Sequence, residues 1–355
     1  GFSLNYQKNK TTITSNINYS NGIIEPNQEY NLTYPTYLWQ EINNKTNYTN
    51  SLSGRLNIDY RLSDKTKIGT EYTYSNSKPL IKSVNKSFIY NRNTIELDSI
   101  IRNESRLDFK RNTKSINVYS ITEIDTLGKK ISFDFDYLNF NSNSNNNFSS
   151  NSFYPNNSLI PNSNFIANNG GLQKIDIYTT KLDFEYPTSW ANFSFGSKLS
   201  FIKNESDVSF FNLTTGNSIL DPSKSNIFTY NENIQAFYVS GNKKLSDKLE
   251  LQLGLRAENT QTTGFSKTLN ETTKNNYFKL FPTVFLSYTI NEDKLLSFNY
   301  SKRIDRPSYS DLNPFRFYTT SFNFSEGNPF LNPSFSENFE LSYTYKNAYS
   351  SLYVN

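Results

Sequence analysis

The chain has 355 residues, a formal net charge of +4, and neither cysteine nor histidine. Disulfides, thiol nucleophiles and thiolate metal sites are therefore excluded within it, and the commonest general base and metal ligand is missing. A mean hydropathy of −0.67 with 35% hydrophobic residues is low for one large apolar core, whereas 26 Tyr and 29 Phe argue against disorder. The weak, scattered basic excess does not indicate a nucleic-acid-binding protein.

Apolar and polar residues alternate with a period of two along the chain, which predicts β-strands with one apolar and one polar face. In residues 249–256, four leucines alternate with Glu250, Gln252, Gly254 and Arg256. A helix would scatter these residues around its axis, whereas a strand separates them onto two faces. The same alternation is clearest, in chain order, over residues 67–75, 130–140, 248–259 and 294–303.

The connections between these patterns alternate in length. Short polar turns are expected within residues 60–69, 123–130, 186–192, 243–250 and 289–296. Much longer segments, expected to be loops, lie at 76–103, 140–171 (rich in Asn and Ser), 204–228, 260–276 and 306–334. Short turns on one rim and long loops on the other are typical of an outer-membrane β-barrel with periplasmic turns and extracellular loops.

The predicted fold class is therefore all-β, a transmembrane antiparallel β-barrel of outer-membrane type with about fourteen strands in this chain. Many of the predicted strands exceed the 5–6 residues usual in soluble sheets and suit a membrane crossing of about 9–11 residues. A soluble sandwich would need shorter strands and a larger apolar fraction, and a propeller would need a repeat of about 40 residues, which the sequence lacks. Tyrosines near the strand ends fit interfacial aromatic belts.

No enzymatic function is expected. A Ser-His-Asp arrangement is impossible without histidine, and neither a glycine-rich phosphate loop nor a calcium-loop spacing occurs. Asp134 and Asp136 share one strand face, expected to be the lumen, where solvated carboxylates are a simpler interpretation than acid–base catalysis. We therefore expect no catalytic residue, no metal site and no cofactor.

The segment KRIDRPSYSDLNPFRFY at 302–318, followed by GNPFLNP at 327–333, combines prolines, arginines and aromatic residues. The prolines interrupt strand pairing and stiffen the chain. Two interpretations stay open, a ligand-binding loop that faces the lumen and a structural loop that packs against its neighbours. The candidate ligand-binding residues are Arg303, Arg306, Tyr309, Asn313, Phe315, Arg316, Tyr318 and Asn328.

Residues 234–346 carry GLRAENT, YFKLFP, RIDRPSYSDLNPF, GNPFLNP and ELSYTY in this order. This stretch resembles the outer-membrane β-barrel family of the TonB-dependent receptor superfamily, of the kind abundant in Bacteroidetes. The resemblance implies a 22-stranded barrel, a size class in which the lumen is plugged. It also implies an N-terminal plug and uptake energised through TonB. The sequence shows no plug, TonB box or closing C-terminal strands, so residues 1–355 are expected to be part of a single barrel domain within a longer precursor.

The resemblance implies a multi-pass barrel in the outer membrane of a Gram-negative bacterium. Its expected function is to bind and import a nutrient through extracellular loops and a plugged lumen. The alternative is a non-transporting barrel that serves as a subunit of a surface or secretion complex. The expected partners are outer-membrane lipid and lipopolysaccharide, the TonB complex through the missing plug, an unidentified nutrient and, by analogy with glycan importers, a surface lipoprotein.

Overall fold

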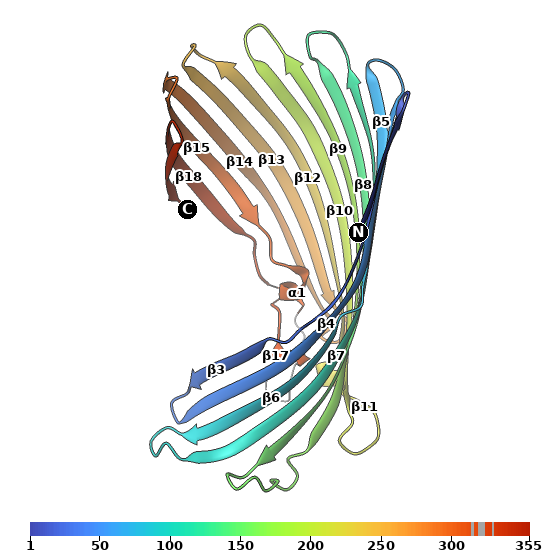
Figure 1. Cartoon of the computed structure of the whole chain (residues 1–355), viewed down its shortest axis with the longest axis vertical. Coiled ribbons are helices and arrows are strands. Elements are labelled where there is room, and N and C mark those ends of the chain that lie inside the picture. Colours follow the sequence, from blue (N-terminus) through green and yellow to red (C-terminus); the bar gives the residue numbers. More distant parts are fainter. Residues whose placement is uncertain (314–315, 319–323, 329) are drawn as a thin grey trace.

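The computed structural model describes residues 1–313, 316–318, 324–328 and 330–355. Seventeen strands form one antiparallel sheet that curves around a concave interior (Figure 1). These strands are β1 (Phe2–Lys8), β2 (Thr11–Ile24), β3 (Asn27–Thr33), β4 (Tyr37–Arg61), β5 (Thr66–Ser77), β6 (Leu80–Asn91), β7 (Leu97–Glu123), β8 (Lys130–Phe153), β9 (Phe165–Pro187), β10 (Asn192–Asn212), β11 (Ile219–Leu220), β12 (Asn226–Lys244), β13 (Leu249–Ser266), β14 (Glu271–Asn291), β15 (Lys294–Asp305), β18 (Ser334–Tyr345) and β19 (Ala348–Val354). Outside this sheet lie the turns η1 (Pro222–Lys224) and α1 (Tyr309–Leu312) and a small hairpin of β16 (Phe317–Tyr318) and β17 (Phe324–Ser325).

The strands follow one another around the sheet as a meander, and two breaks explain most of the difference between seventeen strands and the expected number. β2 and β3 both pair with β4, and Pro26 lies between them. β5 and β6 both pair with β4 and β7, and Pro79 lies between them. Proline has no N–H to donate to a ladder, so each break falls where pairing is weakest. If β2 and β3 count as one strand, β5 and β6 count as one strand, and the two-residue β11 is left out, the sheet has fourteen full strands. This number confirms the prediction of about fourteen strands.

The short turns lie where the sequence predicted them, but the opposite rim differs from the expectation. Of the five segments expected to be long loops, four are largely strand: 76–103, 140–171, 204–228 and 260–276. The Asn/Ser-rich stretch, for example, continues β8 to Phe153, and β9 begins at Phe165. Asn and Ser are depleted in strands on average, but antiparallel pairing on both sides satisfies their backbone groups here. In the fifth segment, 306–334, the described residues before Ser334 lie outside the sheet.

The two faces of the sheet differ in chemistry. On β13, Leu253 and Leu255 are 50% and 43% exposed on the outer face, and Gln252 and Arg256 lie on the inner face. Asp134 and Asp136 likewise share the inner face of β8, as predicted. Exposed apolar side chains on one face of a sheet match the lipid-facing band of a membrane barrel. Among the described residues, no helix is long and apolar enough to cross a membrane.

The ends of β15 and β18 that adjoin the segment 306–334 separate from β14 and lie on the concave side of the sheet. Pairing between β14 and β15 ends at Thr283 and Ser301, directly beside Pro282, which cannot donate to a further rung. Beyond this point Phe335 of β18 lies over the inner face of β14, with its ring centroid 6.4 Å from that of Phe281. This divergence carries the chain after β15 into the interior, where Figure 1 shows α1.

Candidate functional site

The segment from 306 to 334, called the inward segment here, packs against the inner face of strands β8 to β13 through its described residues. It makes three groups of contacts. Arg306 forms ion pairs with β12 and β13, Asn313 bonds to β10, and Tyr318 packs on β8 and β10. The inward segment therefore lies within the concave interior and contacts, in these three groups, residues of the strands that are 48 to 172 positions away in sequence.

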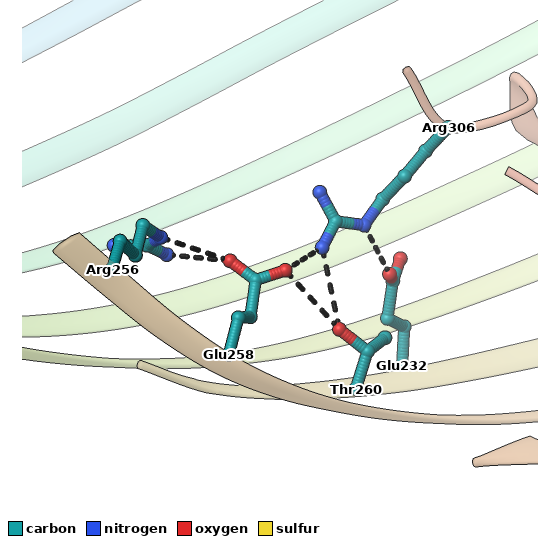
Figure 2. Close-up of polar contacts among 5 residues, drawn as sticks. All are labelled: Glu232, Arg256, Glu258, Thr260 and Arg306. Atoms are coloured by element: carbon teal, nitrogen blue, oxygen red, sulfur yellow. Dashed lines mark hydrogen bonds and ion pairs between the residues drawn. The ribbon is translucent and has the colours of Figure 1, made fainter. Parts of the chain in front are cut away.

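Arg306 is held by two carboxylates of neighbouring strands (Figure 2). Its Nε lies 3.0 Å from Glu232 Oε1 of β12, and its Nη2 donates a short hydrogen bond to Glu258 Oε1 of β13. The same Nη2 lies 3.3 Å from Thr260 Oγ1. The second oxygen of Glu258 accepts two hydrogen bonds from Arg256, at 2.7 and 3.0 Å. Two guanidinium groups and two carboxylates thus alternate in one charge-balanced network, the Arg306 network.

The carboxylates of this network are shielded from water. The Glu232 and Glu258 side chains are only 5% and 4% exposed, whereas that of Arg306 is 28% exposed. Burial alone would lower the pKa of the Arg306 guanidinium, but the charges of Glu258 and Glu232 outweigh burial and raise that pKa. Arg306 is therefore charged, and removing it would leave two buried carboxylates to share the cation of Arg256.

Tyr309 and Asn313 lie against the wall beside the network. The Tyr309 ring centroid is 5.9 Å from that of Tyr230 on β12, and Asn313 Nδ2 donates to Ser206 Oγ on β10 at 3.1 Å. Burial, followed by the nearby Glu232 carboxylate, raises the pKa of the Tyr309 hydroxyl to about 12. Both residues line a cavity of about 700 Å³ between the inward segment and the wall, together with Phe109, Arg111, Phe140 and Ser142.

Tyr318 belongs to an aromatic cluster on the inner face. Its ring centroid lies 5.1 Å from that of Phe210, and its backbone oxygen accepts a hydrogen bond of 3.2 Å from Asn146 Nδ2. Phe148 and Ala167 complete the buried cluster. Lys224 Nζ lies 4.7 Å from the Phe210 ring centroid and 5.5 Å from that of Tyr318, so a cation covers the aromatic faces.

The structure separates the eight candidate residues into two sets. Arg306, Tyr309, Asn313 and Tyr318 contact the inner wall, as described above. The other described candidates, Arg303, Arg316 and Asn328, are exposed. Arg316 pairs with Glu326 inside the segment at 3.0 Å, and the Asn328 side chain accepts from the Phe330 amide. Phe315 lies outside the described residues.

Sequence reasoning missed the residues that hold the inward segment, namely Glu232, Glu258, Thr260 and Ser206 of the wall and Lys224 of η1. One signal was available for Glu258, because the alternation of β13 puts it on the same face as Arg256. No signal in the sequence paired it with Arg306, since the bend at Pro282 that brings β15 inward depends on the register of three strands. The packing interpretation of the segment 302–318 is the one that agrees with these contacts.

A family of outer membrane proteins and one solved fold agree with this architecture. The outer membrane protein beta-barrel family matches residues 122–355, which is more than half of the chain. The crystal structure of the ferric citrate transporter FecA in the unliganded form has a TM-score of 0.52 at 10% sequence identity, with 97% of this chain and 48% of FecA aligned. The ferric yersiniabactin uptake receptor FyuA from Yersinia pestis aligns at 12% identity with a TM-score of 0.46, over 97% of this chain and 52% of the receptor.

The likeness to FecA concerns the fold alone, and the chain spans about half of that protein's length. Comparison with curated protein sequences found no match. The family match, the alternating faces and the fourteen full strands lead to one conclusion. The chain belongs to the outer membrane protein beta-barrel family and is a multi-pass β-barrel of the outer membrane.

Proposed function

We propose that the chain forms part of the barrel wall of a TonB-dependent receptor that imports a nutrient, as in the receptors abundant in Bacteroidetes. The observation that carries this proposal is the cavity of about 700 Å³ on the inner face, which the inward segment closes on one side. Its lining combines aromatic residues with many polar and charged side chains, among them Arg111, Asp311, Asn313 and Glu326, and such a surface suits a polar ligand. The likeness to the fold of FecA, a ferric citrate transporter, supports the same function.

In this proposal the rim opposite the short turns faces the cell exterior, as in other outer-membrane barrels. A nutrient enters from that rim and contacts Tyr309 and Asn313 in the cavity. The Arg306 network holds the inward segment against the wall while the nutrient binds. TonB acts through a plug that belongs to the complete protein, and a surface lipoprotein assists capture at the exterior rim.

Uptake in the native host tests the proposal. Cells that lack this protein should fail to accumulate one nutrient from a panel, and depletion of TonB should cause the same loss in cells that retain the protein. Replacing Asn313 with Leu removes a polar group from the cavity and should weaken uptake of that nutrient, whereas Arg303→Ala changes an exposed side chain and serves as the control. Uptake that survives TonB depletion, together with copurification of a stoichiometric surface complex, would instead assign the barrel to the non-transporting class.

A further inference from the structure

The outer face of β6 and β7 carries a concentration of positive charge. Six exposed cations lie there, and only two acids, Glu104 and Asp108, lie between them on the same face. Six charges less two give a local balance of +4, equal to the formal net charge of the whole chain. We call this surface the cationic stripe, and its members are Lys82, Lys86, Arg102, Arg106, Lys110 and Lys114.

The pairing register brings like charges together within the stripe. Lys82 lies directly opposite Arg106, and Lys86 lies directly opposite Arg102. Side chains that are directly opposite in an antiparallel pair have Cβ atoms about 4.5–5.5 Å apart, and like charges at that distance destabilise the sheet. The acid Glu104 lies opposite Val84 instead of a lysine.

If the stripe neutralised its own charge, each cation of β6 would lie opposite an acid of β7. A shift of two residues between β6 and β7 would keep every side chain on its face and place Lys82 opposite Glu104 or Asp108. The observed register does not make this pairing, and among the described residues the ion pair that the stripe forms is Arg106 with its strand neighbour Asp108 at 3.0 Å. On the inner face of the same two strands, Asn85 lies opposite Asn103, and both are buried.

The neighbouring strands add neutral hydrogen-bond donors and no acid. Each cation of β7 has an asparagine opposite it on β8, at Asn151, Asn147, Asn143 and Asn139. On the other side, Lys86 and Lys82 lie opposite Ile42 and Thr46 of β4. The amide of Asn139 donates to Asp176 of β9 at 2.7 Å, so the amides beside the other three cations of β7 are the ones that face a ligand. Cations flanked by amide groups suit a ligand with anionic oxygens, because ammonium, guanidinium and amide N–H groups all donate to phosphate.

The position of the stripe relative to the membrane identifies the partner. On the outer face, Tyr72, Ile116 and Tyr137 lie side by side on β5, β7 and β8. Lys114 lies two residues further along β7, opposite Tyr74. Tyrosines at this level mark the interface between lipid tails and headgroups. From Lys114, cations recur every four residues along β7 to Arg102, a length of about 40 Å at about 3.3 Å per residue. The stripe thus begins at the lipid headgroups and continues away from the apolar band.

We propose that the cationic stripe binds the phosphorylated saccharide of a lipopolysaccharide anchored in the leaflet around the barrel. A glycolipid whose acyl chains lie beside the apolar band carries its phosphates outward along the direction in which the stripe runs. The bound phosphates offset the repulsion between Lys82 and Arg106 and between Lys86 and Arg102. This binding is independent of the nutrient and of TonB.

Binding of purified lipopolysaccharide to the full-length protein in detergent tests the proposal. The variant K82Q/K86Q removes two stripe charges, and the control K174Q/K203Q removes two outer-face charges that already pair with Asp176 and Glu205. Each lysine near an anionic lipid surface contributes a factor of about five to binding, so K82Q/K86Q should bind on the order of 30-fold more weakly. The control should stay within about twofold, and removal of phosphate from the glycolipid should weaken binding to the unaltered protein.

Three results would overturn the proposal. The first is equal binding by the two double variants, and the second is undiminished binding of the dephosphorylated glycolipid. The third is a preference for an acidic polypeptide such as polyglutamate over lipopolysaccharide, which would assign the stripe to a protein partner. Thermal unfolding distinguishes a role of the lysines in binding from a role in stabilising the fold. If they act in binding, relief of like-charge repulsion should leave the melting temperature of K82Q/K86Q unchanged or higher. A lower melting temperature would mean that the lysines stabilise the fold.

Discussion

Arg303 and Arg306 are close in sequence, yet their surroundings differ completely. Arg303 is exposed on β15, whereas Arg306 contacts two buried carboxylates on strands β12 and β13. An exposed surface charge contributes little to stability, but a cation between buried carboxylates cannot be removed without leaving charge unpaired. The two arginines, equivalent as candidates in the sequence, therefore have different expected effects on the inward segment.

Replacing Arg306 with Ala should release the inward segment from the wall. Loss of a buried partner costs about 3–5 kcal/mol, and the 28% exposure of the Arg306 side chain places the expected cost near the lower end, at about 3 kcal/mol. Hydrogen exchange measures this cost at the backbone amides of Gly327 and Asn328. They donate to the backbone oxygens of Asn313 and Asp311, so their exchange reports opening of the segment. These amides should exchange about 100-fold faster, since each 1.4 kcal/mol corresponds to about a factor of ten.

The matched control is Arg303→Ala, which should change exchange of the same amides by less than about threefold, as expected for an exposed surface position. Arg306→Lys should give an intermediate rate, because an ammonium group retains the charge but not the planar geometry that contacts both carboxylates. Equal exchange in the Ala variants of both arginines would contradict the role assigned to the Arg306 network.

The hydroxyl of Tyr309 makes the attachment of the inward segment sensitive to alkaline pH. Its pKa is raised from 10.0 to about 12 in the folded protein, so the folded state retains this proton at a pH where the released segment loses it. The contribution to stability is fully present below pH 10 and is lost as the pH rises from about 10 to 12. The protection of the segment's amides, which is the intrinsic exchange rate at the same pH divided by their observed rate, should fall across this window, and Tyr309→Phe should reduce that fall. An unchanged pH profile in Tyr309→Phe would contradict the assignment.

At the scale of single elements, the sequence predicts strand type and face well but strand length poorly. The period of two in 249–256 correctly assigned the leucines of β13 to one face. Successive side chains of a strand point to opposite faces, so the alternation follows directly from one face contacting lipid and the other contacting water. The extent of β8 and β9 depends instead on pairing with β7 and β10, which supplies backbone partners to Asn and Ser far beyond the apolar band. Composition alone made 140–171 look like a loop.

A single-residue insertion distinguishes these two interpretations of 140–171. One glycine inserted after Asn145 should shift Phe148 from the inner face to the outer face, because consecutive strand residues point to opposite sides. The aromatic cluster with Phe210 and Tyr318 would then lose a member, at a cost of about 3–5 kcal/mol, comparable to removing a buried Phe. One glycine inserted after Asn157, in the connection between β8 and β9, should cost less than about 1 kcal/mol. Urea unfolding in lipid vesicles measures both, and equal costs would support a loop.

Part of the candidate site could be predicted from the sequence and part could not. The prolines and arginines of 302–318 indicated a segment that leaves the ladder, and four of its residues contact the wall. The wall partners Glu232 and Ser206 could not be predicted, because their contacts depend on where β15 separates from β14 and on the direction it then takes. Such long-range contacts follow from the register of several strands and leave no local pattern.

At the scale of the whole molecule, the assignment of lipid and lumen faces can be tested at two adjacent residues. Leu253 lies near the middle of the apolar band on the outer face of β13, and Gln252 lies beside it on the inner face. An arginine on the lipid face at mid-membrane depth costs about 2–4 kcal/mol, whereas lumen-facing positions accept charge at little cost. Leu253→Arg should therefore lower the free energy of unfolding of the full-length protein in lipid vesicles by about 2–4 kcal/mol, and Gln252→Arg by less than about 1 kcal/mol. The reverse order would mean that the apolar face lines the interior, and the cavity beside Tyr309 and the cationic stripe would then exchange sides.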